Sequence, residues 1–95
     1  MSESTYQSAQ PLYIELPLTD GELQVMQQLD QAEGNLITKA EIADKTGLGG
    51  GDRASNTIEV LVGRIRKKLA TAEAPLRIST VRGRGYHLER LVGEA

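Results

Sequence analysis

The sequence predicts a small α+β domain in which a short strand leads into three helices and a β-hairpin closes the chain. Three observations predict this order. Two segments begin with a Thr followed three residues later by a Glu, which is typical of a capped helix start. A third segment repeats apolar residues at helical spacing. Near the C-terminus, apolar and polar residues alternate on either side of a turn containing glycine.

Composition sets the class of protein. The chain has 95 residues, 39% of them hydrophobic and 25% charged, which is typical of one globular domain with one core. It has no Cys and a single His, His87, so disulfides, thiolate chemistry and a His metal cluster are excluded. No apolar run approaches the roughly 18 residues of a membrane helix, and the cytoplasm is therefore the expected setting.

The N-terminal region precedes the first helix. Residues 1–10 are polar and aperiodic, which predicts a flexible tail or linker and leaves 11–95 as the domain. Residues 12–16 are a candidate short strand that ends at Pro17.

The first two helices share one start signal. Thr19 and Glu22 predict a helix over 20–32, and Thr38 and Glu41 predict a second over 39–46 that ends at Gly47. The following residues, 48–52, contain three adjacent glycines and predict a flexible loop. A phosphate-binding loop is disfavoured there, because no strand precedes it and the Gly-Lys-Ser/Thr ending is missing.

The third predicted helix, over 55–69, has two contrasting faces. Ser55 or Asn56 can cap it, the latter with Glu59 as an acidic partner. An arc of about 100° is apolar and contains Ile58, Leu61, Val62, Ile65 and Leu69. The opposite face contains Asn56, Val60, Arg64 and Lys67, and the flanks carry Arg66 and Lys68. A basic face with an exposed valine favours a binding surface over a merely solvated one.

The predicted hairpin covers 76–90. Residues 76–81 alternate with period two, 82–85 form the turn, and 86–90 return. The turn holds Arg82 and Arg84 apart with glycine, which makes a cationic tip. Tyr86 is expected to anchor the hairpin in the core. His87 has no nearby partner in the sequence and is expected to be structural or a phosphate contact.

Charge is distributed unevenly along the chain. The net charge of −2 argues at first against a nucleic-acid partner, but 1–52 hold two bases against nine acids, a balance of −7. Residues 53–90 hold nine bases against three acids, a balance of +6. A polyanion responds to the local field over about 8–10 Å rather than to the whole-chain charge. The basic half therefore favours nucleic acid and the acidic half another partner, with ordinary solvated surface charge as the alternative.

Three segments together resemble a known family. Residues 55–69 closely resemble the recognition helix of OmpR/PhoB-type response regulators, 78–86 resemble that family's wing, and Leu18-Thr19 with Glu22 resembles its first helix start. The resemblance covers about 16–91. It implies a winged helix-turn-helix, the C-terminal DNA-binding effector domain of a two-component system. Such a domain would bind double-stranded DNA sequence-specifically in transcription regulation, with helix 55–69 in the major groove and the wing, 76–90, at the minor groove.

The resemblance also implies site residues and partners. The implied DNA contacts, extended by the neighbouring cations, are Asn56, Val60, Arg64, Arg66, Lys67, Lys68, Thr80, Arg82 and Arg84. The loop 47–54 would meet RNA polymerase, and copies would bind in tandem on repeated half-sites. No cofactor, metal or catalytic residue is expected.

Each role has a chemical reason. Arg66, Lys67, Lys68 and Arg77 are expected on phosphates, where they release counterions. Arg64 suits guanine, Asn56 adenine and Val60 the thymine methyl group. Arg82 suits a narrow A·T-rich minor groove.

Four departures from the family pattern matter. The phosphorylatable receiver domain is absent, so either the chain is an excised effector domain or the regulator lacks a receiver. The N-terminal sheet is reduced to the strand 12–16. Leu61 stands where the family usually has His, and Gly63 where a basic residue is common. These last two motivate an alternative, a winged-helix protein-interaction module that docks RNA polymerase or another regulator and binds DNA weakly. An enzyme is not expected, because no set of catalytic groups stands out.

Overall fold

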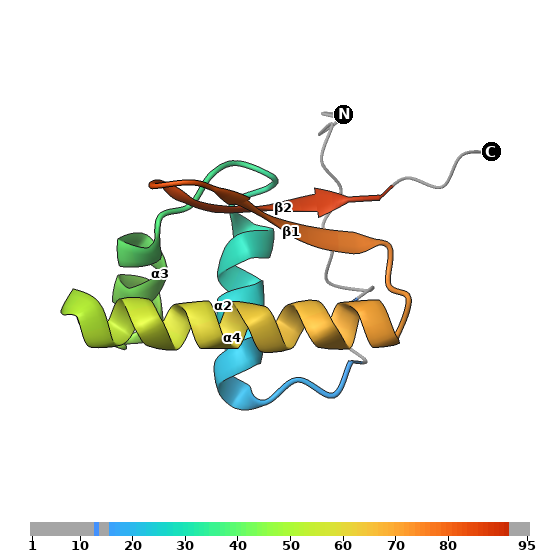
Figure 1. Cartoon of the computed structure of the whole chain (residues 1–95), viewed down its shortest axis with the longest axis horizontal. Coiled ribbons are helices and arrows are strands. Elements are labelled where there is room, and N and C mark those ends of the chain that lie inside the picture. The colour runs from blue at the N-terminus through green and yellow to red at the C-terminus, as the bar shows by residue number, and fades with distance from the viewer. Residues whose placement is uncertain (1–12, 14–15, 92–95) are drawn as a thin grey trace, which may run out of the picture.

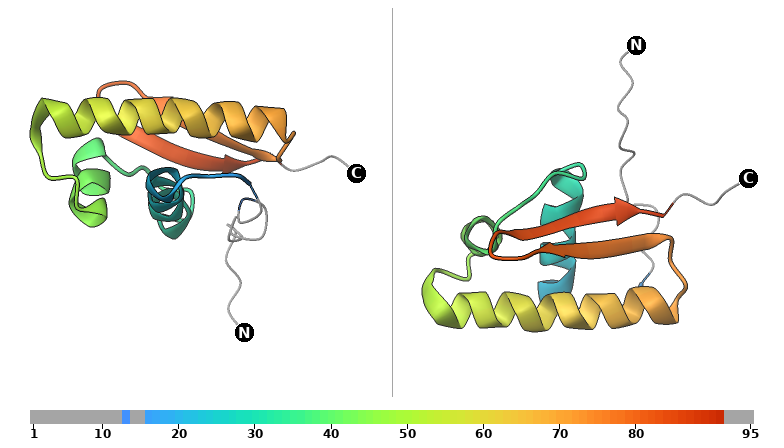
Figure 2. Two further views of the ribbon diagram at one scale, coloured as in Figure 1. Left: turned by 90° about the horizontal axis from the view of Figure 1, so that it is seen from below. Right: turned by 45° about the horizontal axis from the view of Figure 1, so that its top comes forward.

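The computed structural model describes residue 13 and residues 16–91. Within them the chain forms three helices and a two-stranded antiparallel sheet. In chain order the elements are α2 (Asp20–Gln31), α3 (Lys39–Thr46), α4 (Gly51–Thr71), β1 (Leu76–Val81) and β2 (Gly85–Arg90). Helix α4 runs along the length of the molecule with the hairpin beside it, and α2 crosses behind both (Figure 1). Helices α2 and α3 lie on one side of α4 and the hairpin (Figure 2).

Both predicted capping boxes form. The Glu22 N–H donates to Thr19 Oγ1 (3.3 Å), and the Thr19 N–H donates to Glu22 Oε1 (3.0 Å). Thr38 and Glu41 repeat the exchange at 3.0 and 2.9 Å. Each box satisfies two main-chain groups that a helix N-terminus otherwise leaves without partners. The bounds of α3 are the predicted ones, with Gly47 as a left-handed C-cap, and α2 ends one residue before the predicted end.

Helix α4 begins earlier than predicted. It starts at Gly51 after the N-cap Gly50, which has no side chain to cap it, so Ser55 and Asn56 lie inside the helix and cap nothing. The connecting loop therefore shrinks from 47–54 to 47–50. Tertiary packing outweighs the poor helix propensity of glycine here, because Ala54 in the added turn is buried in the core.

The buried stripe of α4 follows the predicted spacing. Ile58, Val62, Ile65 and Leu69 are each no more than 3% exposed, whereas Leu61 is only half-buried. The side chain of Leu61 faces the N-terminal turn of α2, where a Cβ on Gly21 would lie 3.7 Å from its methyl groups. Leu61 therefore packs at the junction of α2 and α4.

The hairpin forms with its predicted strands, and β2 begins one residue early. Its register runs from Leu76↔Arg90 to Val81↔Gly85. β2 also pairs with the segment before α3, because Tyr86 and Ile37 exchange two main-chain hydrogen bonds of 2.8 and 2.9 Å. This approach requires a glycine at 85, where a Cβ would lie 2.2 Å from the Ile37 carbonyl oxygen. Tyr86 is 6% exposed, as its predicted anchoring role requires.

The N-terminal strand expected over 12–16 is wrong for the two of its residues that the structure describes. Tyr13 has helical backbone, Leu16 lies in a bend, and the Leu16 N–H donates to the Tyr13 carbonyl (3.0 Å). Residues 12, 14 and 15 of that strand, and the tail 1–10, lie outside the described residues. Tyr13 is instead a core residue, 2% exposed. Burial, the Asp30 carboxylate and the hydrogen bond between the two side chains raise the pKa of Tyr13 to about 12.

One core joins all the elements. Its buried apolar side chains come from the buried stripe of α4, from α2 and α3, and from the inward faces of the strands. The largest fully buried ones are Tyr13, Met26, Leu29, Ile42, Ile58, Ile65 and Leu88. The core thus fixes α4 against the hairpin, which positions the candidate site described next.

Candidate nucleic-acid interface

The face of α4 opposite the core is exposed. The four side chains predicted there, Asn56, Val60, Arg64 and Lys67, are all exposed, and Val60 is 51% exposed. Asn56, Val60 and Arg64 also line a shallow hollow on this surface. An isolated exposed valine is ordinary, but a valine flanked by an amide and a guanidinium in one hollow combines the groups that read base edges in a major groove.

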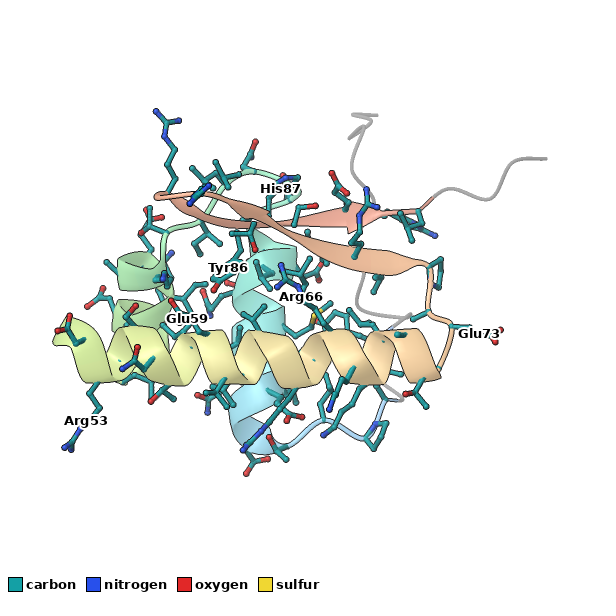
Figure 3. All side chains as sticks on the ribbon, in the orientation of Figure 1. Arg53, Glu59, Arg66, Glu73, Tyr86 and His87 are labelled. Atoms are coloured by element: carbon teal, nitrogen blue, oxygen red, sulfur yellow. The ribbon has the colours of Figure 1, made fainter. Side chains whose placement is uncertain are left out.

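Arg53 is a functional candidate that the sequence prediction missed. It lines the same hollow and is exposed, and it points away from the molecule at the N-terminal end of α4 (Figure 3). The prediction placed it in a loop, because the helix was expected to start at 55. Its spacing of three residues before Asn56 and seven before Val60 is helical, and that spacing is the signal that finds it.

The tip of the hairpin carries the two predicted arginines. Arg82 and Arg84 are exposed and flank Gly83, whose φ of 76° is left-handed and suits glycine. Among the described residues, neither guanidinium forms a hydrogen bond or an ion pair. Both are therefore available to an external anion.

Arg66 and Thr80, both predicted DNA contacts, are bonded to each other. Arg66 Nη2 donates to Thr80 Oγ1 (2.7 Å) and to the Ile78 carbonyl (2.7 Å), and Nε donates to the same carbonyl (3.0 Å). The guanidinium carbon lies 5.8 Å from the centre of the Tyr86 ring. The structure therefore places Arg66 between α4 and the hairpin (Figure 3).

Lys68, another predicted contact, is engaged with the N-terminal end of α2. Its Nζ donates to Glu22 Oε1 (2.6 Å) and to the Pro17 carbonyl (2.8 Å). The Glu22 side chain is 1% exposed. Burial by itself raises the pKa of the Glu22 carboxyl, but the hydrogen bonds from Lys68 and from the Thr19 N–H, and the charges of Lys68 and Arg64, outweigh it and leave the pKa below its usual value.

Two further predicted residues have partners on the hairpin. Arg77 donates to Glu89 Oε1 from Nε (2.8 Å) and Nη2 (2.6 Å). The hydrogen bond from Arg77 lowers the pKa of Glu89. His87 Nε2 lies 3.9 Å from Glu89 Oε2, two residues further along β2, so the expectation that His87 has no nearby partner in the sequence is wrong.

Glu59, expected as a capping partner of Asn56, instead joins two helices. It accepts a hydrogen bond from Lys39 at the start of α3 (2.5 Å). This bond raises the pKa of Lys39. Glu59 therefore forms part of the α3–α4 contact, where the ammonium of Lys39 balances its negative charge.

The exposed cations divide into two groups. Of the cations on α4 and at the hairpin tip, Arg53, Arg64, Lys67, Arg82 and Arg84 have no hydrogen-bond or ion-pair partner within the described part of the chain. Arg66 and Lys68 on α4, and Arg77 on β1, are held within the fold. Residues 13 and 16–91 contain no cluster of three or more His, Asp or Glu side chains that could hold a metal ion. In that same part of the chain, no helix is long and apolar enough to span a membrane.

Comparisons with known proteins find a matching family model and curated relatives. A family model described as "Transcriptional regulatory protein, C terminal" matches residues 14–88. The response regulator SaeR of Staphylococcus epidermidis is 36% identical over 78 residues, which cover 81% of this chain and 34% of that protein. The transcriptional regulatory protein PhoP of Escherichia coli is 35% identical over 74 residues, covering 78% and 33%. The chain thus spans about a third of the length of these curated relatives.

A solved structure has the same fold. The DNA-binding domain of the response regulator AdeR, in complex with an intercistronic region, superposes with a TM-score of 0.67 over 99% of this chain and 98% of that chain. The sequence identity is 21%, so this likeness concerns the fold. It confirms the winged helix-turn-helix expected from the sequence.

Proposed function

The chain belongs to the family of C-terminal domains of transcriptional regulatory proteins, and from that premise we propose that it binds double-stranded DNA sequence-specifically in transcription regulation. It would act as the effector domain of a two-component response regulator. The observation that carries the proposal is the exposed face of α4, where an amide, a valine and cations without internal partners share one surface. Although the net charge is −2, these exposed cations can neutralise the phosphates of a polyanion, because none of them is paired within the described part of the fold.

Helix α4 would enter the major groove with this face. Arg64 has a planar fork that can donate to guanine O6 and N7, Asn56 can pair with adenine, and Val60 can pack on a thymine methyl group. Lys67 would contact phosphate as a point charge. Arg53 extends the same surface by one turn and would meet the next phosphate or base along the groove.

The wing would reach the adjacent minor groove. Arg82 and Arg84 lie at the tip of the hairpin, which Figure 1 places at the same end of the molecule as the N-terminal half of α4. A narrow A·T-rich minor groove concentrates negative potential and favours arginine by shape. Arg66, Lys68 and Thr80, although predicted as contacts, are less suited to this role, because Arg66 Nε and Nη2, Lys68 Nζ and Thr80 Oγ1 already form hydrogen bonds within the fold.

The test begins with selection of bound sequences from a random duplex pool, followed by titration of the selected duplex across salt. We expect log K to fall linearly with log salt concentration. Arg64→Ala should cost about 1–3 kcal/mol of binding on the selected site and relax preference at one position, whereas Lys67→Ala should weaken all sequences alike.

The matched pair makes this assignment falsifiable, since both residues are exposed cations on one helix face. If the two variants lose affinity equally on selected and random duplexes, the division of roles is wrong. If no duplex binds at low salt, and NMR shifts of 53–90 stay unchanged with DNA, the protein-interaction alternative is the better one.

Finer partners form part of the same proposal. The loop 47–50, with the first turn of α4, would contact RNA polymerase, and Leu48 at 40% exposure offers an apolar side chain for that contact. Copies would bind in tandem on half-sites spaced near one helical turn. Recruitment of polymerase to the DNA-bound domain, and the stoichiometry on one and two half-sites, test these two points. No catalytic role is proposed, and the cytoplasmic setting and the bounds 11–95 of the domain stay predictions.

A further inference from the structure

Arg66 is the one α4 side chain among the described residues whose hydrogen bonds reach the hairpin. Its guanidinium donates to the backbone of β1 at Ile78 and to the hydroxyl of Thr80, and it lies over the ring of Tyr86 from β2. Thr80 and Tyr86 are directly opposite in the register. One side chain thus contacts both strands at the same level of the hairpin.

The bonded carbonyl lies on the outer edge of the sheet. The N–H and C=O of Tyr86 both bond to Ile37, so they point away from β1. Backbone groups of an antiparallel strand point alternately to its two edges. Thr80 is paired with Tyr86, whose backbone groups point outward, so those of Thr80 also point away from the partner strand. Ile78 lies two residues before Thr80 on the same strand and points to the same edge. The Ile78 carbonyl therefore points away from β2, to an edge where the described sheet has no further strand. Arg66 supplies the missing donor.

The hairpin is consequently held from both edges. On the β2 edge, Ile37 bonds to Tyr86. On the β1 edge, Arg66 bonds to Ile78 and Thr80. A two-stranded hairpin is weakly stable by itself and is free to twist or tilt unless it is tied at both sides. These two attachments add to the core contacts of the inward strand faces in holding the hairpin against α4.

We propose that Arg66 is a positioning residue that sets the wing against the recognition helix, and thereby the spacing between major-groove and minor-groove contacts. The proposal rests on the proposed function. Arg66 acts through the wing rather than on DNA, since its Nε and Nη2 are already bonded within the protein. The crevice between wing and helix, lined by Lys39, Glu59, Arg66, Arg84 and Tyr86, takes its shape from this contact.

A fork of two donors is needed for this role. Arg66 uses Nε and Nη2 together on one carbonyl while its plane lies over an aromatic ring, and a lysine ammonium cannot reproduce that geometry. Lysine does keep the positive charge that a phosphate contact would need. Arg66→Lys therefore separates the two roles: a positioning residue loses its function, and a phosphate contact retains most of it.

The free protein gives the first readout. In Arg66→Lys and Arg66→Ala we expect NMR shift changes and faster amide exchange across 76–90, with the amides of α2 and α3 unchanged. Lys67→Ala, which removes the neighbouring cation, is the matched control and should leave the chemical shifts and exchange rates of the wing amides unchanged. Wing amides that stay unchanged in both Arg66 variants would overturn the proposal, whatever the DNA result.

The DNA readout is a double-mutant cycle with Arg82→Ala on the selected duplex. Arg66→Ala and Arg66→Lys alone should each lose about tenfold in affinity, as one lost contact does, but less than twofold when Arg82 is already alanine. A loss of the same size in both backgrounds, with Arg66→Lys close to wild type, would show that Arg66 contacts phosphate itself. If Arg66→Ala fails to fold, Arg66→Lys carries both readouts.

The two proposals fail differently. If wild-type protein binds no duplex, the proposed function fails while the amide measurements still decide whether Arg66 holds the wing. If wild type binds and the cycle is additive, only the role of Arg66 is wrong.

Discussion

Gly63 stands in the middle of the exposed surface of α4 without a visible structural reason. A Cβ at this position would meet no atom within 4 Å, and its φ lies outside the left-handed region. Glycine in a helix interior is unfavourable because it loses the most backbone entropy on folding. The family that this chain resembles commonly has a basic residue at this position. The glycine makes α4 less stable, and no contact within the fold compensates for it.

Gly63→Ala should raise the free energy of unfolding by about 1 kcal/mol, the difference in helix propensity. Urea unfolding followed by circular dichroism measures it. Gly47→Ala is the control of opposite sign, since Gly47 has a φ of 77° and alanine there is strained. Two variants that shift stability in the same direction would contradict the prediction.

The exposure of individual candidate residues follows from the sequence more readily than their bonding partners do, because the partners lie far away in the chain. The exposure of Asn56, Val60, Arg64 and Lys67 follows from helical periodicity alone, because the opposite face is apolar. The partners of Arg66 and Lys68 lie 12 to 51 residues away in the chain. No local sequence pattern predicts such contacts. A long cationic side chain beside a buried stripe can turn either toward the fold or toward solvent.

At the scale of elements, the starts of α2 and α3 depend on residues close in the chain, whereas the start of α4 depends on tertiary packing. A capping box needs only residues three apart, so the Thr and Glu pairs predict both starts from sequence. The first turn of α4 contains Gly51 and has no cap, and its stability depends on Ala54 packing into the core. The hairpin likewise depends on a distant segment, because Ile37 bonds to its second strand.

Gly85→Ala tests that dependence. The added Cβ would collide with the Ile37 carbonyl oxygen and lie 2.8 Å from the Thr38 Cα, so the backbone bridge must open. We expect a loss of about 2 kcal/mol in stability, within the range of overpacked sites, and weaker protection of the Tyr86 amide from exchange. Arg84→Ala in the same hairpin should change stability by less than about 0.5 kcal/mol, as exposed sites do. An equally stable Gly85→Ala would show that the bridge is dispensable.

At the scale of the whole molecule, Glu22 and Lys68 join two helices at positions that are 46 residues apart in the sequence. The pair connects the first turn of α2 to the C-terminal half of α4, and Lys68 also bonds to Pro17 ahead of α2. The Glu22 pKa is lower in the fold than its ordinary value of 4.5. The stabilisation is therefore complete above that value and is lost as pH falls through the lower folded-state pKa.

Glu22→Gln should lower stability at neutral pH by about 2 kcal/mol, because Lys68 loses its charged partner at a mostly buried site. It should also flatten the loss of stability below about pH 4.5, the window set by the Glu22 pKa. Thermal unfolding between pH 3 and pH 7 measures both effects. Asp44→Asn, which removes an exposed carboxylate of α3, is the control and should keep the acid dependence of the wild type. An unchanged acid limb in Glu22→Gln would contradict the prediction.

The sequence by itself determined the α+β class, the order of three helices and a hairpin, the two capped helix starts and the apolar and basic faces of the third helix. These features depend on residues close in the chain, and short-range spacing records them. Only the tertiary structure decided where α4 begins, that Arg53 joins its exposed face, and which cations have hydrogen-bond or ion-pair partners within the fold. Arg66 and Lys68 have partners because the core brings distant carbonyl and carboxylate groups close to them. Among the described residues, the cations without such partners form an exposed basic surface on a chain of net charge −2.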